Sequence, residues 1–140
     1  MDPEIELAAA SRDGHLALRR VERQQVLIER VHAAGGRRVR SADLAREFAV
    51  SVRTVARDVE RLRLSGVPLV VHQGRNGGVS LSPRHAVAPV TFTLPEVAAL
   101  MSSLTVLGPT ASQSATSAMA KLADALAPGR TETDPPSPRR

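Results

Sequence analysis

The chain has 140 residues, of which 42% are hydrophobic, so it can hold one ordinary domain or a small domain with an appendage. It has no cysteine, which excludes disulfide frameworks, thiolate zinc sites and cysteine nucleophiles. Its 19 basic residues, almost all arginine, outnumber its 14 acidic residues, and Phe48 and Phe92 are its only aromatic residues. Arginine suits phosphates and guanine edges, whereas RNA and single strands usually need stacking rings, so duplex DNA is the favoured polyanion.

The N-terminal residues 1–16 are interpreted as an extension that precedes the first domain. The first six residues are acidic and lack a basic region followed by a long apolar run, so we expect no secretory signal. No stretch approaches the ~18 apolar residues that a membrane span requires. We therefore expect a cytoplasmic protein with no membrane partner.

Residues 17–82 are rich in arginine, periodic, and predicted to form one domain. Apolar residues at helical spacing predict a long first helix, which should end at Gly35-Gly36. The stripe consists of Leu18, Val21, Leu27, Ile28 and Val31. Residues 37–40 then read as a short extended link.

Two further helices follow this link. Ser41 is the expected N-cap of a helix of about two turns, with Asp43 in its first turn, where the helix dipole favours an anion. Its inner face is Leu44, Ala45 and Phe48. Ser51 is the expected N-cap of the third helix, which should run to Leu64 and end at Gly66.

The third helix, residues 51–64, has two different faces at 100° per residue. The side predicted to pack inward carries Val52, Val55, Val59 and Leu62. The opposite side carries Arg53, Thr54, Arg57 and Arg61. One face therefore belongs to the core, and the other presents a row of guanidinium groups.

A hairpin is predicted over residues 69–81. Two β-prone runs, 69–72 and 79–81, flank a glycine-rich loop that contains Arg75. The glycines are not interpreted as a nucleotide-binding loop, because such loops join a strand to a helix N-terminus, whereas this one joins two strands.

This order of elements is that of a winged helix-turn-helix, in which the third helix enters the major groove and its N-terminal residues come closest to base edges. We expect Arg53 or Arg57 to recognise a base, most plausibly guanine, with Ser51 and Thr54 on phosphate or a base edge. The full set of expected DNA contacts is Ser41, Ser51, Arg53, Thr54, Arg57, Arg61 and Arg75. For Arg75 we keep two alternatives, a contact with the minor groove or backbone and a solvated loop.

Positive charge is concentrated in this part of the chain. From Arg19 to Arg63 there are 12 arginines and 6 acidic residues, so the segment carries 12 − 6 = +6, which is the electrostatic footprint that a DNA-binding surface requires. The alternative is a solvated helix face whose arginines pair with Asp58 and Glu60.

Three stretches of this segment carry a family resemblance: SADLAREFAVSVRTVARDVERL at 41–62, GVPL at 66–69 and QGRNGG at 73–78. Together they resemble the N-terminal DNA-binding domain of DeoR-like, WYL-domain bacterial transcription regulators. The resemblance covers residues 20–82 and implies that Ser51, Arg53, Thr54 and Arg57 face DNA, with Asp58 orienting a neighbouring arginine.

The segment departs from the family pattern at three positions. Members often carry bulky aromatics where this chain has Ala56 and Val79. This implies looser packing between the third helix and the wing, which is the hairpin predicted at residues 69–81. A glycine is common where Ala49 stands, and a Cβ is costly there if the backbone is left-handed.

The C-terminal part is divided into a linker (83–92), a helical pair (93–127) and a disordered tail (128–140). Thr93 and Glu96 predict a capping box with Pro95 in the first turn. Two apolar stripes follow, one with Leu100, Met101, Leu104 and Leu107 and one with Ala115, Ala118, Met119, Leu122 and Leu126. The pair resembles the family's helical linker, and we expect either a homodimer through it or a pair that completes the domain core.

The resemblance would continue into a ligand-sensing WYL domain, which we expect this chain to lack, together with any evident small-molecule effector. We expect no enzyme, no metal site and no cofactor. The four histidines, His15, His32, His72 and His85, show no zinc-site spacing, and no serine lies in a Gly-x-Ser-x-Gly elbow. The alternative function is a protein-interaction module that uses the helix-turn-helix surface without DNA readout.

Overall fold

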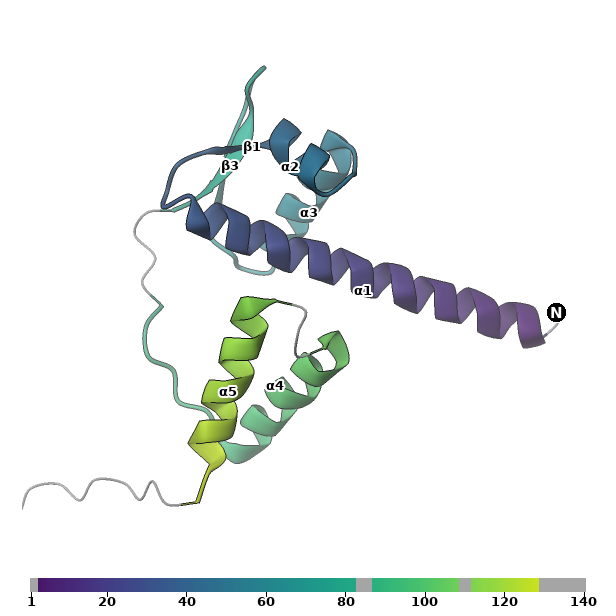
Figure 1. Ribbon diagram of the computed structural model, residues 1–140, viewed down its shortest axis with the longest axis vertical. Helices are drawn as coiled ribbons and strands as arrows, with labels where there is room; N and C mark the ends of the chain where they lie inside the picture. Colours follow the sequence, from purple (N-terminus) through teal and green to yellow (C-terminus); the bar gives the residue numbers. More distant parts are fainter. Residues whose placement is uncertain (1–2, 83–86, 109–111, 129–140) are drawn as a thin grey trace, which may run out of the picture. The chain divides into compact units, whose positions relative to one another are not determined.

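The computed structural model describes residues 3–82, 87–108 and 112–128, which form five helices and three short strands (Figure 1). In chain order these are α1 (Pro3–Ala33), β1 (Val39–Arg40), α2 (Ser41–Glu47), α3 (Val52–Leu64), β2 (Leu69–His72), β3 (Gly78–Leu81), α4 (Leu94–Leu107) and α5 (Gln113–Leu126). They belong to two compact units, 1–90 and 91–140, each of which is described by itself. The predicted fold class is confirmed: a mainly helical winged helix-turn-helix followed by two helices.

The core of the first unit lies where α1, α2, α3 and the sheet meet. Its buried members are Leu27, Val31, Ala34, Val39, Leu44, Ala45, Val55, Val59, Leu62, Leu69 and Val79. α1 and α3 contribute residues three or four apart, because that spacing places them on one face, and α2 contributes the adjacent Leu44 and Ala45. The inner faces of the three helices therefore meet in one apolar cluster, to which Leu18, Val21 and Val52 of the predicted faces do not belong.

α1 begins at Pro3, well before the start that its apolar stripe indicates. Every described side chain from residue 4 to residue 16 is exposed, whereas Leu18 and Val21 are half-buried and Leu27 is fully buried. The apolar period thus marks where the helix meets the core, and not where it begins. The expected extension, residues 1–16, is helical from Pro3 onward, so the boundary expected near residue 16 lies within one continuous helix.

The turn between α2 and α3 closes with two backbone hydrogen bonds. The Val50 N–H donates to the Ala45 carbonyl (3.0 Å) and the Ala49 N–H donates to the Arg46 carbonyl (3.2 Å). This double closure needs a left-handed residue, and Ala49 takes it with φ of 52°. The left-handed backbone expected at Ala49 is therefore present, and Ala49 carries the strain that a glycine would avoid.

The predicted hairpin is confirmed and belongs to a three-stranded antiparallel sheet of order β1-β3-β2. Val79 of β3 pairs with Val71 on one side and with Val39 on the other. The link predicted at 37–40 therefore ends in a strand, which the sequence did not reveal because two residues carry no period.

Gly78 lies in the central strand, where the backbones of β1 and β3 approach closely. A Cβ added at this position would lie 2.2 Å from the Val39 carbonyl oxygen, a separation that no real contact permits. The close pairing of β1 with β3 therefore requires a residue without a side chain.

The second unit is a pair of helices, α4 and α5, packed against each other. The predicted start of α4 is confirmed: the Glu96 carboxylate accepts from the Thr93 backbone N–H (2.7 Å) and from its hydroxyl (2.9 Å). These two hydrogen bonds, the backbone one foremost, lower the pKa of Glu96. At α5, the Ser112 hydroxyl caps the helix by accepting from the Ala115 N–H (3.0 Å).

The apolar stripes of the pair are only partly covered within the unit. Met101 and Leu104 are half-buried, whereas Leu100 and Leu126, which the stripes place with them, are each 40% exposed. Residues 87–92 of the expected linker form no helix or strand. Its residues 83–86 and the expected disordered tail beyond Pro128 lie outside the described residues.

We predict that Gly78→Ala lowers the free energy of unfolding by about 1–3 kcal/mol, because β1 and β3 must separate to admit the methyl group. The matched control is Gly14→Ala in α1, where a Cβ has no neighbour within 4 Å. The control should leave the free energy unchanged or raise it by up to about 1 kcal/mol. Urea denaturation compares the two variants, and equal values for both would contradict the close-approach argument.

Candidate nucleic-acid interface

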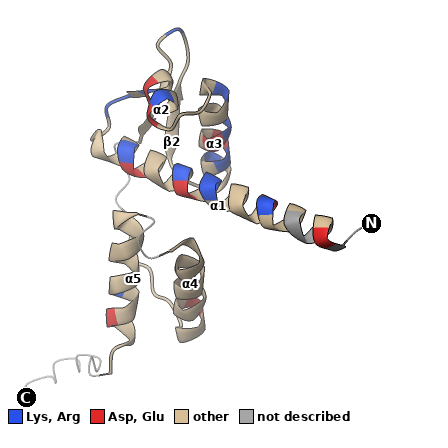
Figure 2. Ribbon diagram, turned by 45° about the vertical axis from the view of Figure 1, so that its right-hand side comes forward, with Lys and Arg blue, Asp and Glu red and all other residues tan. Residues whose placement is uncertain are grey.

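The two faces of α3 are separated as the sequence predicts. Val55, Val59 and Leu62 are buried against the other elements of the first unit. Arg53, Arg57 and Arg61 are exposed on the outer side, together with Ser51, and Thr54 is half-buried. Figure 2 shows basic positions recurring along this helix. The outer face is therefore a free basic surface on a helix whose inner face is fixed in the core.

The prediction for Val52 is wrong. It was predicted to pack inward, but it is 49% exposed. Although it shares the angular position of Val55, it stands in the first turn of α3, which borders an open hollow beside the wing. The core begins one turn later along the helix.

Ser51 caps α3 as predicted. Its hydroxyl accepts from the Thr54 N–H (3.1 Å) and lies 3.0 Å from the Thr54 hydroxyl. The two hydroxyls therefore fix the start of the helix and each other, and both stand at the end of α3 that carries Arg53 and Arg57.

Ser41 does not cap α2, contrary to the prediction. It is the first helical residue, and the N-cap position belongs to Arg40, whose side chain makes no capping hydrogen bond. Instead, the Ser41 backbone N–H donates to the Gly77 carbonyl in the wing loop (3.0 Å). This bond ties the start of α2 to the wing.

Asp58 is a buried charged residue on the inner side of α3, with 1% of its surface exposed. The Arg23 Nε donates to its Oδ2 (2.5 Å) and the Gln24 Nε2 donates to its Oδ1 (3.1 Å). A buried carboxylate is tolerated only when it is paired and hydrogen-bonded, and here α1 supplies both partners. The burial of Asp58 could have been predicted from the sequence, because this residue lies three positions after Val55 and four before Leu62 and so shares their face of the helix.

The arginines of α3 are not equivalent. Arg61 lies 3.7 Å from the Asp58 carboxylate, and Arg63 pairs with Glu60 (3.2 Å). Within the described part of the chain, neither Arg53 nor Arg57 forms an ion pair. The alternative of a self-neutralised face thus applies to the C-terminal half of the row, whereas the N-terminal half keeps its charge available.

The wing and the first turns of α2 and α3 enclose a hollow of about 320 Å³. Its lining includes Arg40, Ser41, Val52, Ala56, Gln73 and Arg75. Arg75 is exposed on the wing loop, as expected of it. Sequence reasoning missed Arg40, because a residue in a short link carries no helical or strand period that would orient it.

A smaller hollow of about 220 Å³ adjoins this one between α3 and the strands. Ala56 and Val79, the two small residues at which looser packing was expected, both line it, together with Val71. Space is thus left between wing and helix at the two positions from which large side chains are missing.

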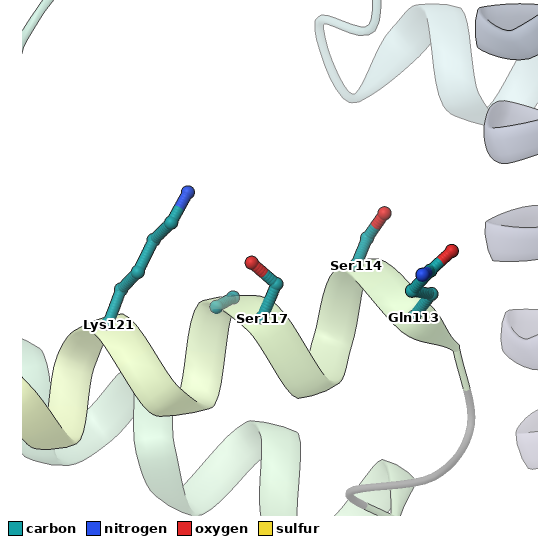
Figure 3. A pocket seen from close by; sticks show the side chains of 5 residues that line it. Gln113, Ser114, Ser117 and Lys121 are labelled. Atoms are coloured by element: carbon teal, nitrogen blue, oxygen red, sulfur yellow. The ribbon is translucent and has the colours of Figure 1, made fainter.

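A polar strip on α5, formed by Gln113, Ser114, Ser117 and Lys121, is a shallow depression whose lining comes from a single helix (Figure 3). Within the residues that the structure describes, no cluster of histidine and acidic side chains is placed to hold a metal ion. None of the described helices is both long enough and apolar enough to span a bilayer.

Comparison with known proteins places this interface in a recognised domain. Residues 23–80 match the family model of the HTH domain. The uncharacterized HTH-type transcriptional regulator YobV of Bacillus subtilis (strain 168) is 35% identical over 68 residues, which are 49% of this chain and 22% of that protein. No solved structure matches the chain. The residues 23–80 that match this family model run from α1 to β3 and include α2 and α3.

We predict that Asp58→Ala lowers the free energy of unfolding by about 2–3 kcal/mol, because Arg23 and Gln24 lose a buried partner while Arg23 keeps some access to water. Glu60→Ala is the matched control, since it removes an exposed carboxylate paired with Arg63 in the same helix and should cost less than about 1 kcal/mol. Chemical denaturation of both variants checks this; a similar small change in each would show that the buried pair does not hold α3 to α1.

Proposed function

We propose that this protein is a sequence-specific transcription regulator that binds double-stranded DNA with α3 in the major groove. The observation that carries the proposal is the pair of exposed arginines Arg53 and Arg57, which form no ion pair among the described residues and lie on a helix whose opposite face is buried. A major groove about 12 Å wide admits one such helix. The similarity of residues 23–80 to the HTH domain supports the same orientation.

The residues of the proposed interface divide by role. Arg53 and Arg57 stand near the start of α3, where base edges are closest, and bidentate contact with guanine O6 and N7 is their natural use. Ser51 and Thr54 reach phosphate or a base edge from the same end. Arg61 lies close to the Asp58 carboxylate and is assigned to the phosphate backbone of the DNA.

The wing and α2 supply the remaining proposed contacts. Arg75 lies on the exposed loop between β2 and β3, from which it reaches the minor groove or a phosphate. Ser41 lies beside this loop at the start of α2 and is assigned to the phosphate backbone.

A protein-interaction module is the second candidate function, because a helix-turn-helix surface can also dock proteins. Salt dependence separates the two functions. A duplex binder that makes about six phosphate contacts should show a slope near −5 in a plot of log K against log salt concentration, owing to counterion release. A protein partner need not show this slope.

We predict that Arg57→Ala weakens binding to a duplex selected from a random pool by about 1–3 kcal/mol and relaxes base preference at one position. Arg12→Ala removes the same charge from the exposed part of α1 and serves as the control, with affinity and preference expected to stay as in the wild type. Fluorescence anisotropy on the selected duplex and on single-base variants measures both effects. Unchanged affinity and unchanged preference in Arg57→Ala would overturn the assignment of this residue.

We further propose that the protein works as a homodimer, with the α4–α5 pair as the contact between copies. Within this unit, Leu94 is 68% exposed and Val106 is 77% exposed, and few charged side chains surround them. Exposed apolar surface of this kind favours association. A dimer would read two half-sites with centres about one helical turn apart.

Sedimentation at micromolar concentration tests the dimer, with and without DNA. Wild-type protein should sediment as a dimer, and Val106→Glu combined with Leu94→Glu should shift it to monomer, because two carboxylates would have to be buried at the contact. Circular dichroism of the variant checks that the helices persist. Only monomers in the wild type, in both conditions, would remove the dimer and favour helices that complete the domain core.

A further inference from the structure

Arg40 occupies a position where its chemistry does not help the fold. It is the N-cap of α2, with φ of −70° and ψ of 135°, and its side chain makes no capping hydrogen bond. Serine, threonine, aspartate and asparagine are preferred there, since their oxygens accept from the free N–H groups of the first turn. Arg40 has no such oxygen, so the start of α2 forgoes a stabilising cap.

Arg40 instead lines the hollow between α2, α3 and the wing. Arg75 borders this hollow from the wing loop, with the amides of Gln73 and Asn76 beside it. One arginine from β1 and, from the loop between β2 and β3, a second arginine with two amide residues therefore line one open space of about 320 Å³.

The charge of this hollow is not compensated. No aspartate or glutamate belongs to its lining. Among the described residues, neither Arg40 nor Arg75 forms an ion pair. Asp43, which lines another hollow together with Arg40, is paired with Arg46. Glu60, which lines the adjoining smaller hollow, is paired with Arg63. Such a set of donors without a carboxylate suits an anion that accepts several hydrogen bonds.

We propose that this hollow seats one phosphate of the DNA backbone, held between Arg40 and Arg75. The proposal rests on the proposed function, because α3 must lie in the groove that the same backbone strand borders. Phosphate contacts fix the register of a protein on the duplex without reading sequence. Arg40 is thus a positioning residue that sets where Arg53 and Arg57 meet the bases.

A free phosphate or a phosphorylated small molecule offers the same chemistry as a phosphate of the DNA backbone. The experiments must therefore separate a free anion from DNA as the source of the phosphate.

Arg40→Ser is the decisive variant, since serine supplies the missing cap and removes the guanidinium. We expect its melting temperature to rise by about 4 °C. We expect its affinity for the selected duplex to fall by about tenfold, with a salt slope shallower by about 0.9.

Two matched variants complete the set. Arg38→Ser removes the same charge from an exposed arginine two residues earlier that does not line this hollow, and its affinity should stay within about twofold of the wild type. Arg40→Lys keeps the charge and should retain most of the affinity and the full salt slope. A more stable protein that binds DNA less well cannot be explained by damage to the fold.

A second arm identifies the phosphate itself. Replacing single phosphates of the duplex by neutral methylphosphonates should reveal one position where the loss of affinity is about tenfold smaller for Arg40→Ser than for the wild type, because the variant has only the Arg75 contact left to lose there. Titration with inorganic phosphate, followed by NMR of the wing amides, should show no saturable binding at millimolar concentration.

Each contrary outcome has a distinct meaning. Wild-type affinity and slope in Arg40→Ser, or an equal loss in Arg38→Ser, overturns the phosphate seat and leaves the proposed function standing. Saturable binding of inorganic phosphate that Arg40→Ser abolishes, with DNA affinity unchanged, assigns the hollow to a free anion instead. A wild-type protein that ignores duplex DNA at low salt overturns both proposals.

Discussion

The arrangement of the first unit depends on one buried carboxylate. Asp58 lies on the inner side of α3 and is held by Arg23 and Gln24, which stand 35 and 34 residues earlier on α1. A charge in this position is costly unless its partners are in place, so α3 is stable in one rotation about its axis and not in others. That rotation turns Arg53 and Arg57 outward. The basic face is therefore a consequence of how the acidic residue is satisfied.

The wing is fixed to the helices by backbone contacts. The Ser41 N–H reaches the wing loop at Gly77, and Gly78 lets β3 lie directly against Val39. These contacts use no side chain, which leaves the Arg75 and Arg40 side chains free of a structural role. A surface built this way can change its arginines with little effect on the frame, and one such change, Arg40→Ser, should even stabilise it.

The sequence was most informative where a residue's neighbours lie within one turn of helix. The cap at Ser51, the stop at Gly66 and the buried side of α3 all follow from such local spacing, and all are observed. The failures depend on distant partners: Val52 is exposed because the start of α3 borders an open hollow beside the wing, and Asp58 finds its partner on α1. A two-residue strand such as β1 is invisible for the same reason, since only β3 defines it.

α1 consists of an exposed N-terminal half and a C-terminal half that packs on the core. The helix has 31 residues, about 46 Å, but only its second half touches the core. Segments of ~12–15 residues are marginal helices in water unless something packs on them. Backbone amides before Leu16 should therefore exchange their hydrogens rapidly by local opening, while those around Leu27 exchange only when the whole domain opens. Proteolysis at this end should therefore shorten α1 and leave the core of the first unit intact.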